Sequence, residues 1–125
     1  MIWGIQWDLT CDFISKKGEQ KSITNSTTWG NYSNSTGNAA VMDGTTQKYG
    51  SDQVTGYSEY WKANNIYDLA GNWWEWTQEA YSTYGRAYRG GAYDHDGSDY
   101  PMSYHDRYNA TLTSPISSRP TLIIK

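Results

Sequence analysis

The chain has 125 residues, a length that fits one domain over 1–125, and its net charge is −3. Its Lys and Arg residues are scattered, which excludes the basic footprint of a nucleic-acid-binding protein, and no apolar run reaches the ~20 residues of a membrane span. Aliphatic residues are scarce, so we expect a core built from the seven Trp and twelve Tyr, while twelve Gly indicate many turns.

Apolar residues near the N-terminus fit two periodicities. Alternation at positions 3, 5, 7, 9, 11 and 13 is typical of a strand, whereas Ile5, Leu9 and Phe13 follow the i, i+4, i+8 spacing of a helix. The other apolar residues beside that stripe are Trp7, Cys11 and Ile14. Gly18 follows two lysines as a C-terminal stop signal, so we predict a helix over about 5–16.

Cys11 is the only cysteine of the chain. A single cysteine excludes an internal disulfide, a CxxC redox motif and a cysteine-rich zinc site. We therefore expect Cys11 to be a buried, small apolar residue.

Residues 18–60 are polar and rich in turn-forming residues. We expect a long irregular loop, anchored to the core by Trp29-Gly30-Asn31-Tyr32 and by Tyr57 to Trp61. A loop of this length in a compact domain is usually functional.

The second half of the chain is denser in strand signals. An Ala70-Gly71-Asn72 turn is followed by an aromatic run that predicts a strand ending at Thr77. A second strand is predicted over Arg86 to Tyr93, where Gly90-Gly91 indicates a bulge or a close backbone approach. Pro120 to Ile124 is predicted to form a closing strand.

Four motifs, in this order, resemble the formylglycine-generating-enzyme (sulfatase-modifying factor) family, whose domains are a variant of the C-type lectin fold. They are Gln6-Trp7-Asp8, Trp29-Gly30-Asn31, the segment Asn65 to Thr77 with its Ala-Gly-Asn and Trp-Glu-Trp elements, and Arg89-Gly90-Gly91-Ala92-Tyr93. The resemblance implies an α+β, C-type lectin-like fold with short strands, one or two helices and much irregular loop.

The chain departs from the family pattern at two places. Ser117-Ser118-Arg119 stands where the family usually has Gly-Phe-Arg. The N-terminal strands that normally precede the first helix are missing, which suggests the C-terminal part of a longer family architecture or a minimised version of it.

The resemblance raises the question of enzymatic activity. The family's oxidases hold copper with two cysteines shortly after Arg-Gly-Gly, and the stretch from Tyr93 to Tyr100 contains none, so copper and thiol chemistry are excluded. Related iron enzymes use three histidines, whereas this chain has His95 and His105; with Asp96 or Asp106 they could form a 2-His-1-carboxylate site. No spacing singles out a hydrolase set. We predict a protein that is not an enzyme.

A structural calcium site is also implied by the resemblance. It places oxygen ligands at Asp68, Glu75 and the carbonyls of Gly71 and Trp73, and such hard oxygen donors suit Ca²⁺. The alternative is that Asp68 and Glu75 hydrogen-bond local backbone.

Residues 93–109 combine large tyrosines with short polar side chains, the chemistry of antibody-type binding surfaces. We predict ligand-binding roles for Tyr93, Asp94, His95, Asp96, Ser98, Asp99, Tyr100, Tyr104, His105, Asp106, Tyr108 and Asn109. The alternative is a solvated loop with tyrosines packed beneath it.

The stretch from Tyr93 to Ser118 also resembles the variable proteins of diversity-generating retroelements, which are C-type-lectin domains of the same family. Randomised asparagine codons there become Tyr, His, Asp, Ser, Thr, Ala or Ile, and this stretch is biased that way. The resemblance implies a bacterial or phage binding domain, displayed on a cell surface, secreted or carried by a virion, with a hypervariable face for a cell-surface protein or glycan. A degenerate or accessory domain with a structural role ranks second, and a metal-dependent oxidase third.

Overall fold

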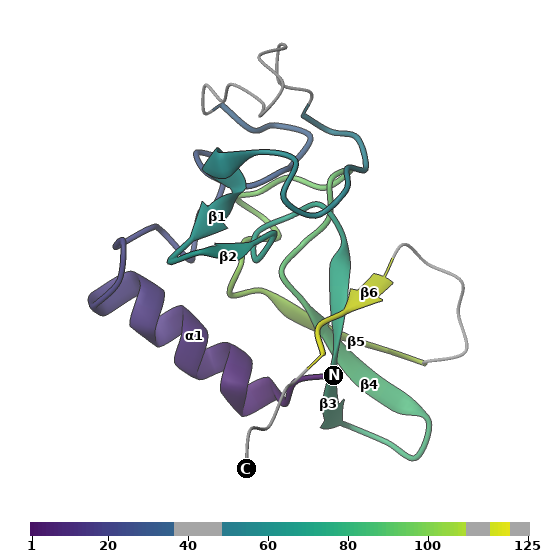
Figure 1. Ribbon diagram of the computed structural model, residues 1–125. Helices are drawn as coiled ribbons and strands as arrows, with labels where there is room; N and C mark the ends of the chain where they lie inside the picture. The colour runs from purple at the N-terminus through teal and green to yellow at the C-terminus, as the bar shows by residue number, and fades with distance from the viewer. Residues whose placement is uncertain (37–48, 110–115, 121–125) are drawn as a thin grey trace.

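The computed structural model describes residues 1–36, 49–109 and 116–120. Within these ranges the fold is α+β, with one α-helix, one 3₁₀ turn and two small sheets joined by irregular loops (Figure 1). The elements are α1 (Gly4–Lys16), η1 (Glu59–Trp61), β1 (Lys62–Ala63), β2 (Ile66–Tyr67), β3 (Trp74–Ala80), β4 (Gly85–Arg89), β5 (His105–Asn109) and β6 (Ile116–Ser118). None of the described helices has the length and apolarity that a bilayer crossing requires.

Helix α1 confirms the helical prediction, but its two apolar stripes have different environments. Trp7, Cys11 and Ile14 are buried, and the Trp7 indole N–H donates to the Met102 carbonyl at 3.0 Å. Ile5 and Leu9 are 64% and 63% exposed. The indole supplies both the larger apolar surface and a specific hydrogen bond, which explains why its stripe faces the core.

Cys11 is buried, as predicted. Burial, reinforced by the nearby Asp8 carboxylate, raises the pKa of its thiol to about 11. The thiol is therefore protonated at neutral pH and acts as a small apolar residue.

Arg89 connects the helix to the main sheet. Its buried guanidinium donates to Asp8 of α1 at 2.9 Å and to Glu79 of β3 at 2.7 Å, while Arg89 itself ends β4. One side chain thus links three elements with charge-assisted hydrogen bonds.

The larger sheet has the strand order β5-β4-β3-β6, in which β3 and β6 are parallel and the other pairs are antiparallel. β3 begins at Trp74 and continues past the predicted end to Ala80. β4 ends at Arg89, earlier than predicted, because Gly90 and Gly91 adopt φ values of +91° and +77° that leave the strand conformation.

The strands at the C-terminal end differ from the sequence prediction. β5 was not predicted, because all five of its residues are exposed and its sequence shows no alternation of apolar and polar residues. The predicted closing strand over 120–124 lies, apart from Pro120, outside the described residues, and Pro120 itself follows β6 without joining a strand.

The smaller sheet is the β1–β2 hairpin. Its turn residues, Asn64 and Asn65, both have positive φ, as the tight turns of two-residue hairpins require. Before η1, the described part of residues 18–60 contains no helix or strand, in agreement with the predicted irregular loop. Trp29, Tyr32 and Trp61 are buried and anchor it.

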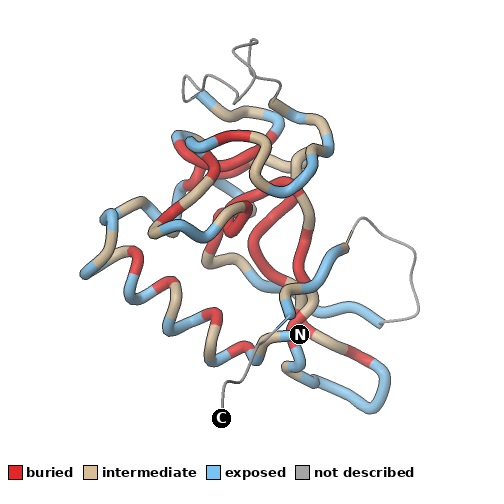
Figure 2. Tube along the Cα trace, in the orientation of Figure 1, coloured by how far each residue is buried: buried red, intermediate tan, exposed pale blue. Residues whose placement is uncertain are grey.

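The buried core (Figure 2) includes residues of two sequence motifs, Trp29 and Tyr32 from one and Leu69 and Ala70 from the other, and these motifs meet. Asn31 forms a parallel bridge with Gly71, the Asn72 N–H donates to the Asn31 carbonyl at 2.9 Å, and the Asn31 and Asn72 amides are joined at 3.1 Å. A Cβ on Gly71 would lie 2.1 Å from the Asn31 carbonyl oxygen. We call this contact between residues 29–32 and 69–72 the loop junction.

Candidate ligand-binding surface

The residues predicted to bind a ligand reach solvent in the structure. Seven are exposed and five are half-buried. The exposed ones are Asp94, Ser98, Asp99, His105, Asp106, Tyr108 and Asn109, and the half-buried ones are Tyr93, His95, Asp96, Tyr100 and Tyr104. We call these twelve residues the recognition surface. None of them belongs to the buried core.

The backbone beneath the recognition surface is held by bonds from the preceding loop. The Gly97 N–H donates to Asn34 Oδ1 at 2.9 Å, and the Gly97 carbonyl accepts from the Ser26 N–H at 2.9 Å. The His95 carbonyl accepts from both the N–H and the hydroxyl of Ser33, at 3.0 and 2.9 Å. The scaffold therefore fixes the loop backbone at His95 and Gly97 without using the side chains of the recognition surface.

A local turn orders the middle of the loop. Asp96 Oδ1 accepts from the Ser98 N–H at 2.7 Å and from the Ser98 hydroxyl, and these bonds lower the pKa of the Asp96 carboxyl. The Tyr100 N–H donates to the Asp96 carbonyl at 2.9 Å. An aspartate that bonds its own backbone two residues on is typical of a tight surface turn.

Aromatic rings form a cluster at the centre of this region. Trp74 of β3 is buried, and its ring lies 5.3 Å from His95, 5.9 Å from Tyr100 and 5.8 Å from Tyr104, measured between centroids. Tyr88 of β4 contacts the same indole at 4.8 Å. His95, Tyr100 and Tyr104, three of the five half-buried members of the recognition surface, thus stand on an aromatic platform, the first two in edge-to-face geometry.

The platform residues Trp74 and Tyr88 were not among the predicted site residues. Strand alternation could have predicted the position of Trp74, because Trp74 and Trp76 point to one face of β3 and Glu75 to the other. Both Trp74 and Trp76 contact Tyr88, which confirms that they share a face.

Strand β5 carries the C-terminal part of the recognition surface. It pairs along its full length with β4, from Arg89 opposite His105 to Gly85 opposite Asn109. Tyr108 is 46% exposed, and the Tyr104 hydroxyl donates to Asp106 at 3.3 Å. The surface is therefore part loop and part strand.

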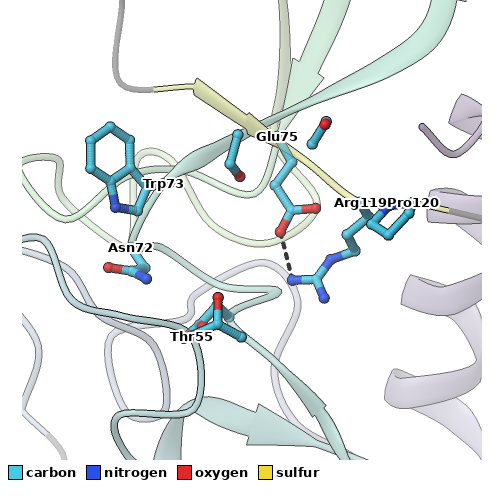
Figure 3. A pocket seen from close by; sticks show the side chains of 9 residues that line it. Thr55, Asn72, Trp73, Glu75, Arg119 and Pro120 are labelled. Carbon is cyan, nitrogen blue, oxygen red and sulfur yellow. Dashed lines mark hydrogen bonds and ion pairs between the residues drawn. The ribbon is translucent and has the colours of Figure 1, made fainter.

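On the opposite face of β3 lies a cavity of about 240 Å³, which we call the acidic cavity (Figure 3). It is lined by Thr55, Asp68, Asn72, Trp73, Glu75, Ser117, Ser118, Arg119 and Pro120. Three of the four predicted calcium ligands, Asp68, Trp73 and Glu75, are in this set. Gly71 is not among the lining residues; it belongs to the loop junction, and its N–H donates to the Gly90 carbonyl at 2.7 Å.

The two carboxylates of the cavity are buried, at 6% exposure for Asp68 and 4% for Glu75. Glu75 Oε1 accepts from the Arg119 guanidinium at 2.6 Å, and Arg119 also donates to the Tyr67 carbonyl at 2.6 Å. Both Asp68 oxygens and Glu75 Oε2 find no hydrogen-bond partner among the described residues. No local backbone group of the described residues meets hydrogen-bond geometry with either carboxylate.

Burial dominates the electrostatics of the pair. It raises the pKa of Glu75 to about 7, although the Arg119 charge and hydrogen bond act in the opposite direction. Burial also raises the pKa of Asp68, against the charge of Arg119. The Gly56 N–H and the Thr55 hydroxyl approach Asp68 and lower its pKa in part, but neither meets hydrogen-bond geometry.

Calcium fits this set only in part. The carboxylates are suitable hard donors, but Ca²⁺ takes six to eight oxygens and Glu75 already shares its charge with Arg119. Among the described residues, no three His, Cys, Asp or Glu side chains are grouped to hold a metal ion, and this includes His95 and His105 with their neighbouring aspartates. His95 instead contacts Asp94, with 2.7 Å between Nδ1 and Oδ1.

Comparison with known proteins adds no relative. No protein-family model matches the chain, and neither the curated proteins nor the solved structures yield a match. The relation to the formylglycine-generating-enzyme family therefore stays a resemblance carried by the motifs.

Proposed function

We propose that the chain is a non-catalytic ligand-binding domain of the C-type-lectin, formylglycine-generating-enzyme-like type. Its recognition surface would bind a protein or a glycan on a cell surface. One observation carries the proposal: the twelve predicted residues reach solvent, on a loop and a strand whose backbones are bonded to the scaffold.

The chemistry of the surface supports recognition rather than catalysis. Tyr100, Tyr104 and His95 offer rigid rings on the Trp74 platform, and the exposed Asp94, Ser98 and Asp99 add adaptable hydrogen bonds. Rigid aromatic area combined with short polar groups is how antibody-type surfaces bind. A backbone held in advance also reduces the entropy lost on binding.

The same arrangement supports the proposal of diversification. Substituting a side chain of the recognition surface leaves the bonds between the scaffold and the loop in place, because on the loop side those bonds are made by the peptide groups of His95 and Gly97. The surface would then tolerate many sequences. This is what a variable protein of a diversity-generating retroelement requires, and such a protein would be displayed, secreted or virion-borne.

An accessory role ranks second and has its own supporting observation. Trp3, Ile5, Leu9 and Phe13 expose an apolar stripe along α1, at 49% to 64% of their surface. Such stripes are typical of surfaces that contact other protein.

A display library tests the binding proposal without knowledge of the natural ligand. The twelve recognition positions would be randomised in the full chain on yeast and selected against a purified target protein such as lysozyme. We expect most members to be displayed folded and specific binders to be recovered. A matched library at twelve buried positions, including Trp7, Tyr32 and Trp61, should display poorly. Equal loss of display in both libraries would refute the proposal.

A further inference from the structure

The acidic cavity presents three buried carboxylate oxygens that the described residues leave without donors: Asp68 Oδ1, Asp68 Oδ2 and Glu75 Oε2. In Figure 3 the Glu75 carboxylate points into the space bounded by Thr55, Asn72 and Arg119. Buried polar atoms are normally paired, so oxygens left free in a cavity indicate a ligand that brings its own donors.

The charge of the cavity sets the charge of that ligand. The lining contains two carboxylates, Asp68 and Glu75, and one guanidinium, Arg119, which leaves one net negative charge when all are ionised. Arg119 is held in place by bonds of 2.6 Å to Glu75 and to the Tyr67 carbonyl. A monovalent cation would therefore neutralise the net charge of the cavity. A divalent ion would leave excess positive charge beside the fixed Arg119 guanidinium.

The backbone around the carboxylates adopts uncommon conformations. Asp68 and Asn72 both adopt left-handed backbone conformations, with φ of +56° and +65°. Such conformations are uncommon for residues other than glycine and concentrate at functional sites. They bring the Asp68 carboxylate into the cavity from a tight turn rather than from a strand.

The rim of the cavity suits an alkyl chain that carries the charge. Thr55, Ser117 and Ser118 are exposed and open the cavity to solvent, and the half-buried Trp73 contributes an aromatic wall. Because one water occupies about 30 Å³ in the liquid, a cavity of about 240 Å³ can hold an amine with a short chain. Indole rings also attract cations.

We infer that the acidic cavity binds a primary ammonium group of lysine-side-chain size. The three N–H donors of such a group match the three unpaired oxygens of Asp68 and Glu75 in number. This site lies on the face of β3 opposite to the Trp74 platform, so the inference does not depend on the proposed function of the recognition surface.

Calorimetry with n-butylammonium chloride tests the inference, in HEPES buffer at pH 8 with sodium chloride at equal ionic strength as the blank. We expect saturable binding to the full chain and a loss of at least tenfold in affinity for Asp68→Asn. Tetramethylammonium, which has the charge but no N–H, should bind more weakly. Nα-acetyl-lysine amide imitates a lysine within a protein, because its backbone groups are blocked. If it also binds, the lysine of a partner protein fits the cavity; if only butylammonium binds, the ligand is a free amine.

Two controls keep the result interpretable. Asp68→Asn should fold as well as the unsubstituted chain, because the carboxylate that it replaces makes no hydrogen bond with the described residues. Asp12→Asn, at an exposed aspartate of α1 outside the cavity, should bind normally. In the unsubstituted chain, the amide NMR signals of Trp73, Ser117 and Ser118 should shift on titration, which locates the site independently of any variant.

Three outcomes would overturn the inference. They are absence of saturable butylammonium binding, unchanged affinity in Asp68→Asn, and a preference for calcium chloride over butylammonium that depends on Asp68. The last outcome would identify the cavity as a metal site instead.

Discussion

The loop junction and the recognition surface are neighbours in the fold but use their residues in opposite ways. At the junction, Asn31, Gly71 and Asn72 are buried, and their backbones touch so closely that side-chain size is restricted. On the recognition surface the scaffold bonds the backbone and leaves the side chains in solvent. We therefore propose that the fold fixes residue identity at the loop junction and leaves it free on the recognition surface.

The largest effect is expected for Gly71→Ala. The new Cβ would lie 2.1 Å from the Asn31 carbonyl oxygen at a φ of +74°, so steric overlap adds to backbone strain. We expect a loss of about 4 kcal/mol or more in the free energy of unfolding, measured by urea denaturation.

Gly56→Ala is the matched control, because its φ of +82° carries the same strain but no atom lies within 4 Å. Its cost should be about 1–2 kcal/mol. Equal costs would show that the junction is not closely packed.

The next largest effect concerns the platform beneath the recognition surface. Trp74→Ala removes a buried indole that contacts four rings and should cost about 3–5 kcal/mol in the free energy of unfolding. Tyr108→Ala, on the exposed strand β5, should change it by less than about 0.5 kcal/mol. A large loss for Tyr108→Ala would place that residue in the core and remove it from the recognition surface.

The acidic cavity should make stability depend on pH. Because the pKa of Glu75 is raised from 4.5 to about 7 in the folded chain, stability is unaffected by this group below pH 4.5 and falls as pH rises through 7. The loss amounts to roughly 3 kcal/mol, at about 1.4 kcal/mol for each unit of pKa. Asp68 contributes in the same direction.

Urea denaturation between pH 5 and pH 8 measures this slope, in phosphate buffer with EDTA so that neither amines nor metals occupy the cavity. In Glu75→Gln the slope should flatten. A stability that rises over this range in the unsubstituted chain would contradict the burial of an ionisable Glu75.

The smallest effect is expected on the outer stripe of α1. Leu9 is 63% exposed, so Leu9→Gln should alter the free energy of unfolding by less than about 0.5 kcal/mol. Ile14 is fully buried one turn away, and Ile14→Ala should cost about 2–4 kcal/mol. Thermal melting of both variants is sufficient. A reversed order would mean that the stripe of Ile5, Leu9 and Phe13 faces the core.

Sequence patterns predicted the helix, the cores of β3 and β4, the buried Trp29 and Tyr32 anchors, and the solvent exposure of the recognition residues, but not β1, β2, β5 or β6. The pattern of α1 did not reveal which of two apolar stripes is buried, because that depends on the partner of the Trp7 indole, 95 residues away. β5 was not predicted, because an edge strand with no buried face shows no alternation of apolar and polar residues. The Arg119–Glu75 contact was not predicted, because the two residues are 44 positions apart and no local sequence pattern relates them.

The most direct test of the central claim is the sequence of the same locus from several isolates. We predict substitutions concentrated between Tyr93 and Ser117, over an unchanged loop junction. Within that stretch the structure adds a finer expectation: Gly97, Pro101 and Met102 are buried and should stay constant, while the residues of the recognition surface change. Divergence spread evenly along the chain, or substitutions that fall on those three buried positions as often as on the recognition surface, would contradict the account.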